Sequence, residues 1–125
     1  MVTALLDTSI VVDVLRGYPP ARTWLSTQTD LGATRVVWLE VLEGADNGRE
    51  QRRAIKLLNE FEVVETISSD LDWATEQLIR LWLSHKIDAF DCLIASVNYR
   101  LQLPLYTTNI KHFTPLLGAL PQRPY

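Results

Sequence analysis

The sequence contains a single cysteine, Cys92, so no disulfide can form within the chain. The absence of a disulfide framework favours a reducing environment, and we expect the protein to act in the cytoplasm. No uninterrupted apolar segment approaches the roughly 18 residues that a membrane span requires. The first apolar run has no preceding Lys or Arg and is interrupted by Asp7, which argues against a secretory signal.

Positive charge and glycine are also scarce. Lys and Arg number 12 against 15 Asp and Glu, and the formal net charge of −3 gives no global attraction to nucleic acid. Any attraction to RNA or DNA must therefore be local. The five glycines form no Gly-x-Gly motif, so dinucleotide binding is poorly supported. No Cys–His or Ser–His pair stands in a context that suits nucleophilic catalysis.

Short strand-like runs alternate with longer runs of helical spacing along the 125 residues. We expect strands within 2–7, 31–36, 61–67 and 103–109. We expect helices within 9–16, 20–27, 36–45, 49–60, 68–86 and 88–101, with Ser9 and Ser69 as helix caps. This alternation predicts one domain, residues 1–125, with the α/β three-layer sandwich architecture and a central parallel β-sheet flanked by helices.

One carboxylate, Asp7, ends the first expected strand in "VTALLDTSIVVDVL". Burying a lone carboxylate costs several kcal/mol unless a partner compensates it. In open parallel sheets, sites form beyond the carboxyl ends of the strands, where the strand order reverses. Asp7 therefore either faces such a crevice or caps the helix that follows.

Two more carboxylates lie in similarly apolar surroundings. Glu40 stands in "VVWLEVLEGA", with Glu43 three residues later, and Asp91 stands in "DAFDCLIASV", close to Asp88. Three carboxylates that converge could bind a hard divalent cation such as Mg²⁺ or Mn²⁺. Each also has a simpler interpretation. The glutamates could lie on a solvated helix face, and the aspartates could be an N-cap and a first-turn acid.

The surroundings of these acids resemble a known family. "LLDTSIVVDVLRG" looks like the opening of PIN-domain ribonucleases, and of VapC-type toxins in particular. "LEVLEGA" resembles their Glu-x-x-x-Gly segment, and "DAFDCLIASVNYRLQLPLYTTNIKHF" resembles their Asp-x-x-Ile-Ala helix, strand and Thr-x-Asn…Phe turn. The resemblance covers nearly the whole chain. It implies a PIN-like, Rossmann-like fold, divalent-metal-dependent RNA cleavage, frequent homodimers and, for the toxins, a cognate VapB-type antitoxin.

The resemblance also assigns residues. Three acids match the catalytic and metal-binding acids of the family, and two further residues match groups that support them: Asp7, Glu40 and Asp91, with Thr107 and Asn109. Thr107 matches a hydroxyl that helps orient the first acid. The family often has a further acid near the last turn, where this sequence has Asn109 and His112. This departure weakens the expectation of a second metal site, and Asp88 is the alternative for the missing acid.

Local positive charge occurs in "REQRRAIK", within the expected helix 49–60. Its basic residues are spaced three and four apart and form a stripe able to reach RNA phosphates: Arg49, Arg52, Arg53 and Lys56. Arg16, after the first helix, is another candidate for substrate binding. A solvated helix face, balanced by Glu50 and Glu60, is the simpler interpretation of the stripe.

Two other functional classes fit the expected fold less well. A response-regulator receiver domain needs an acidic pair at the first strand and a phospho-acceptor aspartate after a middle strand, and the sequence has neither. A non-catalytic module that binds RNA or an antitoxin would gain nothing from converging carboxylates. The sequence therefore favours a Mg²⁺- or Mn²⁺-dependent ribonuclease, with the interaction module as the alternative.

Overall fold

Five short strands and seven helices alternate along residues 1–125, all of which the computed structural model describes. The strands are β1 (Ala4–Leu6), β2 (Leu31–Thr34), β3 (Glu62–Val64), β4 (Leu105–Tyr106) and β5 (Pro121–Gln122). The helices are α1 (Thr8–Leu15), α2 (Pro19–Ser26), α3 (Arg35–Glu43), α4 (Gly48–Leu58), α5 (Ser68–His85), α6 (Ala89–Leu101) and α7 (Ile110–Leu117).

All five strands are parallel and follow the order β3-β2-β1-β4-β5. Strand β1 is central, with Ala4 opposite Leu31 of β2 and Leu5 opposite Leu105 of β4. The chain moves outward from β1 in one direction through β2 and β3, and in the other through β4 and β5. The strand order therefore reverses at β1 and β4, whose carboxyl ends are the expected position of a site.

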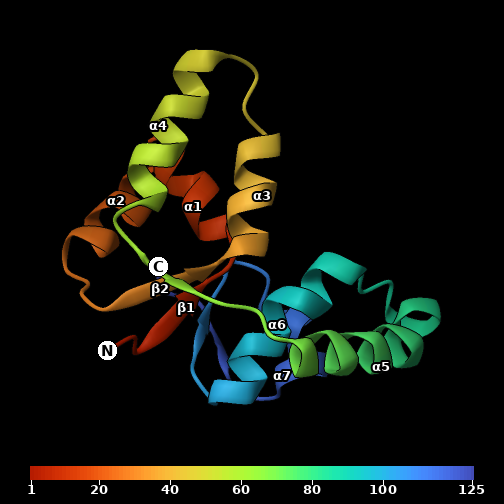
Figure 1. Cartoon of the computed structure of the whole chain (residues 1–125). Helices are drawn as coiled ribbons and strands as arrows, with labels where there is room; N and C mark the ends of the chain where they lie inside the picture. The colour runs from red at the N-terminus through yellow and green to blue at the C-terminus, as the bar shows by residue number, and fades with distance from the viewer.

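The helices form two groups around the sheet. Helices α1 to α4 pack together, and α5 to α7 form the second group, as Figure 1 shows. Strand β1 is buried along its whole length, as expected for a parallel strand covered on both faces. This arrangement confirms the predicted α/β fold with a central parallel sheet.

The apolar core draws on both ends of the chain. A cluster of 24 buried residues includes Leu5 and Leu6 of β1 together with Phe113 and Leu117 of α7. Packing between distant segments holds β1 and the short strand β4 side by side. No helix is long and apolar enough to cross a membrane.

The structure differs from the sequence prediction at several element ends. Helix α1 begins at Thr8, so Ser9 lies inside it and Asp7 takes the N-cap position. Helix α5 begins at Ser68. At its start the Asp70 carboxylate, and not Ser69, accepts a hydrogen bond from the backbone amide of Ile67. Both predicted serine caps are therefore wrong.

Helix α7 and strand β5 were not predicted. Pro115 lies inside α7 and interrupts its helical sequence pattern. Strand β5 has only two residues, the first of which is Pro121. The segment after Asn109 therefore reads as a turn in the sequence, although it supplies a helix that packs against α6.

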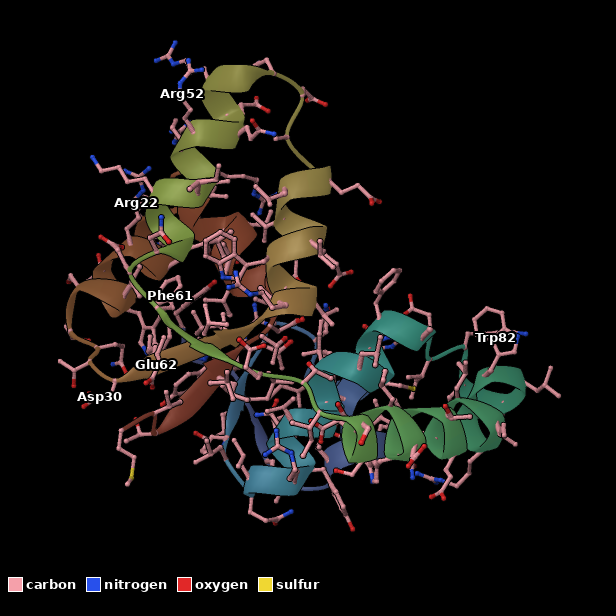
Figure 2. All side chains as sticks on the ribbon, in the orientation of Figure 1. Arg22, Asp30, Arg52, Phe61, Glu62 and Trp82 are labelled. Carbon is pink, nitrogen blue, oxygen red and sulfur yellow. The ribbon has the colours of Figure 1, made fainter.

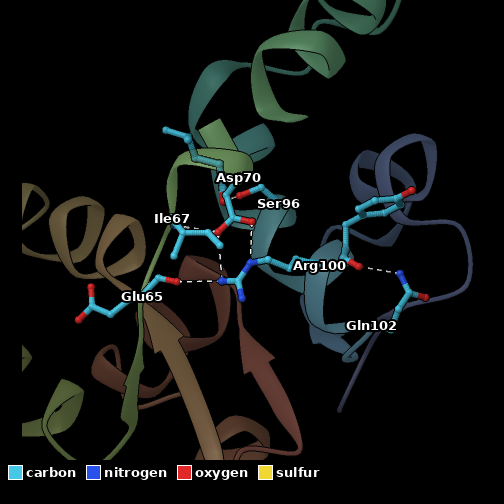
Figure 3. A network of polar contacts seen from close by, with 8 residues as sticks. Glu65, Ile67, Asp70, Ser96, Arg100 and Gln102 are labelled. Carbon is cyan, nitrogen blue, oxygen red and sulfur yellow. Dashed lines mark hydrogen bonds and ion pairs between the residues drawn. The ribbon is translucent and has the colours of Figure 1, made fainter. Parts of the chain in front are cut away.

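A buried ion pair joins α5 to α6 (Figure 3). Asp70 is only 2% exposed, and its carboxylate accepts bonds from Arg100 Nε at 2.9 Å and Nη2 at 3.1 Å. The backbone amide of Ile67 donates to the same carboxylate, and Arg100 also donates to the Glu65 carbonyl at 3.0 Å. These bonds fix the start of α5 against the end of α6.

Candidate active site

Asp7 lies at the carboxyl end of the central strand and is 5% exposed. Its Oδ2 atom accepts hydrogen bonds from Ser9 Oγ and from Thr107 Oγ1, each at 2.8 Å. The side chain makes no capping bond to α1, although the residue occupies the N-cap position. The structure therefore rules out the capping role and places the carboxylate beside Thr107, which follows β4.

Glu40 projects from α3 toward the same edge of the sheet. Its Oε1 accepts a bond from Thr8 Oγ1 at 2.8 Å. Burial raises the pKa of Glu40, and the negative charges of Asp7, Asp91 and Asp88 raise it further, against the opposing effect of the Thr8 bond. Acids from three separate segments thus repel one another here. Glu43 is exposed at the end of α3 and does not contribute to the pKa of Glu40.

Asp91 is the third residue of α6 and lies near the same acids. Asp88 caps α6, because its Oδ1 accepts a bond from the Asp91 amide at 2.9 Å. Burial is the main cause that raises the pKa of Asp91, and the charge of Asp88 adds to it, whereas the bond to His112 opposes the increase. The sequence left the role of Asp88 open, and the structure gives it this capping bond.

His112 is a site residue whose role the sequence left open. It lies in the first turn of α7, and its Nε2 atom is 2.5 Å from Asp91 Oδ2. In the sequence it stands out only as a residue without a carboxylate near the last turn, because α7 itself was not predicted. No local sequence signal marks this contact, since it depends on the packing of α7 against α6.

The three carboxylates are each held through one oxygen only. Asp7 Oδ1, Glu40 Oε2 and Asp91 Oδ1 accept no hydrogen bond from the protein. No lysine or arginine forms an ion pair with any of the three. The donor set, three carboxylate oxygens that no protein group contacts, fits a hard divalent cation.

In this structure the three acids are not arranged around a common metal position. No group of three or more His, Cys, Asp or Glu side chains stands close enough together to hold a metal ion. The bonds from Thr8, Ser9, Thr107 and His112 restrain the carboxylates, and metal binding would require the free oxygens to turn toward one another. Rotation about the last side-chain torsion of Asp or Glu meets only a low energy barrier.

Thr34 ends β2 next to this site. The register of β1 and β2 pairs Ala4 with Leu31 and Leu5 with Gly32, and its continuation brings Thr34 level with Asp7. The Thr34 hydroxyl is buried and has no hydrogen-bond partner. An unpaired buried hydroxyl is uncommon in native proteins. Its position adds a further polar group beside the acids, which the sequence did not indicate.

The predicted basic residues are not gathered in one place. Arg16 and Arg53 line a cavity of about 490 Å³ that also reaches Glu40. Arg49, Arg52 and Lys56 are exposed and do not line it, and Figure 2 shows Arg52 at the far end of α4. The structure thus brings only part of the predicted substrate-binding set close to the acids. Asn109 is exposed at the start of α7, and its side chain caps nothing.

Cys92 gives no alternative nucleophile. It is fully buried behind Asp91, and burial together with the negative charges of Asp91 and Asp88 raises the pKa of its thiol to about 11. A thiol with this pKa is protonated near neutral pH and unreactive. Cys92 instead packs within the apolar core.

Sequence comparison agrees with the observed fold. The family model for the PIN domain matches residues 4–113. The chain belongs to the PIN domain family. Ribonuclease VapC19 of Mycobacterium tuberculosis is a relative with 32% identity over 127 aligned residues, which cover 97% of this chain and 98% of the relative. The family expected from the sequence motifs is therefore confirmed.

Solved structures with the same fold come from other bacteria. A toxin–antitoxin complex from Klebsiella pneumoniae aligns with a TM-score of 0.80 and 23% identity over 98% of each chain. VapBC2 from Rickettsia felis, bound to a DNA fragment from its promoter, aligns with a TM-score of 0.76 and 21% identity, also over 98% of each chain. At these identities the structural likeness establishes the fold.

Proposed function

We propose that this protein is a divalent-metal-dependent endoribonuclease that hydrolyses RNA phosphodiester bonds and serves as the toxin of a type II toxin–antitoxin pair. The observation that carries the proposal is the set of three carboxylates, each with one free oxygen and none paired with a lysine or arginine. A relative named a ribonuclease, at 32% identity, supports RNA as the substrate.

Asp7, Glu40 and Asp91 would hold Mg²⁺ or Mn²⁺. A divalent ion at such a site can acidify a bound water and offset charge on the phosphoryl oxygens. Ser9 and Thr107 fix the Asp7 carboxylate, and Thr8 fixes that of Glu40. These bonds reduce the freedom of the acids before the substrate binds, which favours a single productive geometry.

His112 orients the third acid. Its ring contacts Asp91 Oδ2 and leaves Oδ1 free, so it selects the oxygen that faces the proposed ion. The second ring nitrogen, Nδ1, makes no hydrogen bond within the protein. His112 is therefore a positioning residue in this proposal, and it lies between the acids and the surface.

One metal ion is expected in the RNA-free protein. One divalent ion nearly neutralises three carboxylates, which leaves weak attraction for a second, and two such ions a few Å apart repel each other. Asn109 and His112 supply no carboxylate in the region where relatives often have one. A second ion, if the reaction uses one, should enter with a phosphate of the RNA.

The proposed partners are a VapB-type antitoxin and a second copy of the chain, and the proposed location is the cytoplasm. Several of the similar structures are toxin–antitoxin complexes, which supports the first partner. The end of α5 leaves Ile79, Trp82 and Leu83 exposed, and Figure 2 shows Trp82 directed away from the sheet. Large exposed apolar side chains of this kind suit contact with another protein.

The proposal is tested by incubating the purified chain with RNA, with Mg²⁺ or Mn²⁺ and with a chelator in parallel. We expect cleavage only with metal, and its loss in Asp91→Asn. Asp72→Asn, an exposed aspartate of α5, is the matched control and should cleave at the wild-type rate. A wild-type protein that binds RNA or an antitoxin without cleaving RNA would support the non-catalytic module instead. Mapping of RNA ends after brief expression would identify the target.

A further inference from the structure

A second pocket, basic where the first site is acidic, lies at the start of α7. Its volume is about 620 Å³, and no carboxylate lines it. The lining residues are Thr108, Asn109, Ile110, Lys111, His112 and Arg123. Three of these six side chains can carry positive charge, although the net charge of the whole chain is −3. This is the local concentration of positive charge that the overall composition lacks.

The two strong cations of the pocket pair with no aspartate or glutamate side chain. Neither Lys111 nor Arg123 forms an ion pair. Arg123 is nevertheless held in place, because its Nη1 donates to the Thr108 carbonyl and its Nε donates to the Tyr125 backbone oxygen, both at 3.1 Å. Its Nη2 makes no hydrogen bond within the protein. A guanidinium fixed in this way, with a free donor, is prepared to bind an anion with little loss of entropy.

The pocket shares a wall with the acidic site. The Thr107 hydroxyl donates a hydrogen bond to Asp7 and accepts one from the backbone amide of Asn109 at 3.0 Å. The backbone amide of Thr108 donates to Ser9 Oγ at 3.2 Å. Residues 107–109 therefore connect the two sites: Thr107 bonds to Asp7, and Thr108 and Asn109 line the basic pocket. His112 spans the same boundary, because it lines the pocket and contacts Asp91.

We propose that this pocket binds an internal phosphodiester of the RNA strand, next to the phosphate that is cleaved, through Lys111 and Arg123. The inference rests on the proposed ribonuclease function. Carboxylates repel a polyanion, and one metal ion offsets this repulsion only for the phosphate beside it. A neighbouring phosphate needs its own cations. The basic pocket supplies them, separated from the acids only by the segment 107–109. Contacts of this type position the strand without reading its sequence.

The test measures binding of a short single-stranded RNA by fluorescence anisotropy over a series of salt concentrations, in chelator so that no RNA is cleaved. Each phosphate contact on a single strand contributes roughly 0.7 to the slope of log K against log salt. We expect Lys111→Gln and Arg123→Gln each to reduce the slope by roughly 0.7 and the double variant by roughly 1.4. Arg22→Gln changes the charge equally on α2, outside this pocket, and should leave the slope unchanged.

Two further arms sharpen the result. The charge-preserving variants Lys111→Arg and Arg123→Lys should retain the wild-type slope, which separates loss of charge from damage to the fold. RNA with a 5′-phosphate and RNA with a 5′-hydroxyl should give the same loss of slope. An effect restricted to the phosphorylated strand would show that the pocket binds a terminal phosphate and would overturn the proposal. An unchanged slope in the double variant, or an equal loss in Arg22→Gln, would also overturn it.

A cleavage assay separates this inference from the proposed function. With metal present, the double variant should raise KM severalfold and change kcat little, because the cations bind a phosphate that does not react. If the wild type does not cleave RNA, the proposed function fails, but the salt series in chelator still decides whether the pocket binds phosphate. If cleavage occurs and KM does not change in the double variant, the pocket proposal alone is wrong.

Discussion

Asp70 and Asp7 are both buried aspartates, yet their surroundings differ in charge. Asp70 is 2% exposed and receives two bonds from Arg100, whereas Asp7 is 5% exposed and receives bonds only from hydroxyls. The fold therefore neutralises one buried carboxylate and leaves the other without a cation. Because an uncompensated buried charge is unfavourable, the acidic site is best explained as a place completed by an external cation.

The contrast extends to the neighbours of the two residues. The Asp70 carboxylate is surrounded by donors from Arg100 and Ile67, and no other acid contacts it. The Asp7 carboxylate lies near Glu40, and its charge and that of Asp91 add to the effect of burial in raising the pKa of Glu40. The Asp70–Arg100 ion pair connects two helices and stabilises the fold. The acidic site around Asp7 destabilises the fold in the absence of a cation, as functional sites commonly do.

The largest expected effect is on catalysis. Asp7→Asn keeps the size of the side chain and an oxygen that can accept the bonds from Ser9 and Thr107, but it removes the charge of a proposed metal ligand. We expect the rate of RNA cleavage to fall about a thousandfold, equivalent to about 4 kcal/mol of barrier. The free energy of unfolding should not decrease, because one of several repelling charges is gone. Single-turnover cleavage and urea denaturation measure the two quantities, and a variant with wild-type cleavage would contradict the assignment of Asp7.

The next prediction concerns the buried ion pair between Asp70 and Arg100. Arg100→Met leaves Asp70 buried without its cation, and we expect the free energy of unfolding to fall by about 3 kcal/mol. Cleavage per folded molecule should be unchanged, since this ion pair does not contact the acidic site. Urea denaturation measures the loss of stability. Adding Asp70→Asn to Arg100→Met should recover part of it, and a larger loss in the double variant would argue against a simple buried-charge effect.

A smaller effect concerns pH in the absence of metal. The pKa values of Glu40 and Asp91 are raised from 4.5 and 3.8, so folding favours their protonated forms. This contribution to stability is fully present below those values and is lost as the pH rises through the raised pKa values. We therefore expect Glu40→Gln to lose less stability than the wild type as the pH rises above 4.5, measured by urea denaturation in chelator. Identical pH dependence in the two proteins would show that Glu40 is not strained by its neighbours.

The smallest expected effect is at Thr34. Its buried hydroxyl has no hydrogen-bond partner, so Thr34→Val removes a polar group without removing a hydrogen bond. We expect the free energy of unfolding to change by less than about 0.5 kcal/mol or to increase slightly. Thermal denaturation can measure this change. A loss of about 1 kcal/mol or more would indicate that the hydroxyl is satisfied by ordered water beside the acids.

Much of the fold could be predicted, because hydrophobic periodicity marks the first four strands and the first six helices. The position of Asp7 after the first strand also followed from the sequence. The distinction between capping and crevice did not, because it depends on Thr107, 100 residues away in the chain. Local sequence pattern contains no information about such a contact.

The basic residues and His112 show a second limit. Spacing in the sequence correctly placed Arg49, Arg52, Arg53 and Lys56 on one helix, but the distance of that helix from the acids depends on tertiary packing. His112 lies on a helix that Pro115 conceals, so neither its helix nor its contact with Asp91 could be read from the sequence. The resemblance to a family supplied the acids, and the structure supplied the groups that hold them.

Calorimetric titration of the RNA-free protein with Mn²⁺ tests the central claim most directly. The account predicts one saturable site in the wild type, its loss in Asp7→Asn, and its retention in Asp72→Asn, which removes a carboxylate from the exposed face of α5. Each protein should unfold cooperatively in a parallel thermal scan, so that loss of binding reports on the site. A wild type that binds no Mn²⁺, or an Asp7→Asn variant that binds it as tightly as the wild type, would contradict the claim that a divalent cation completes the acidic site.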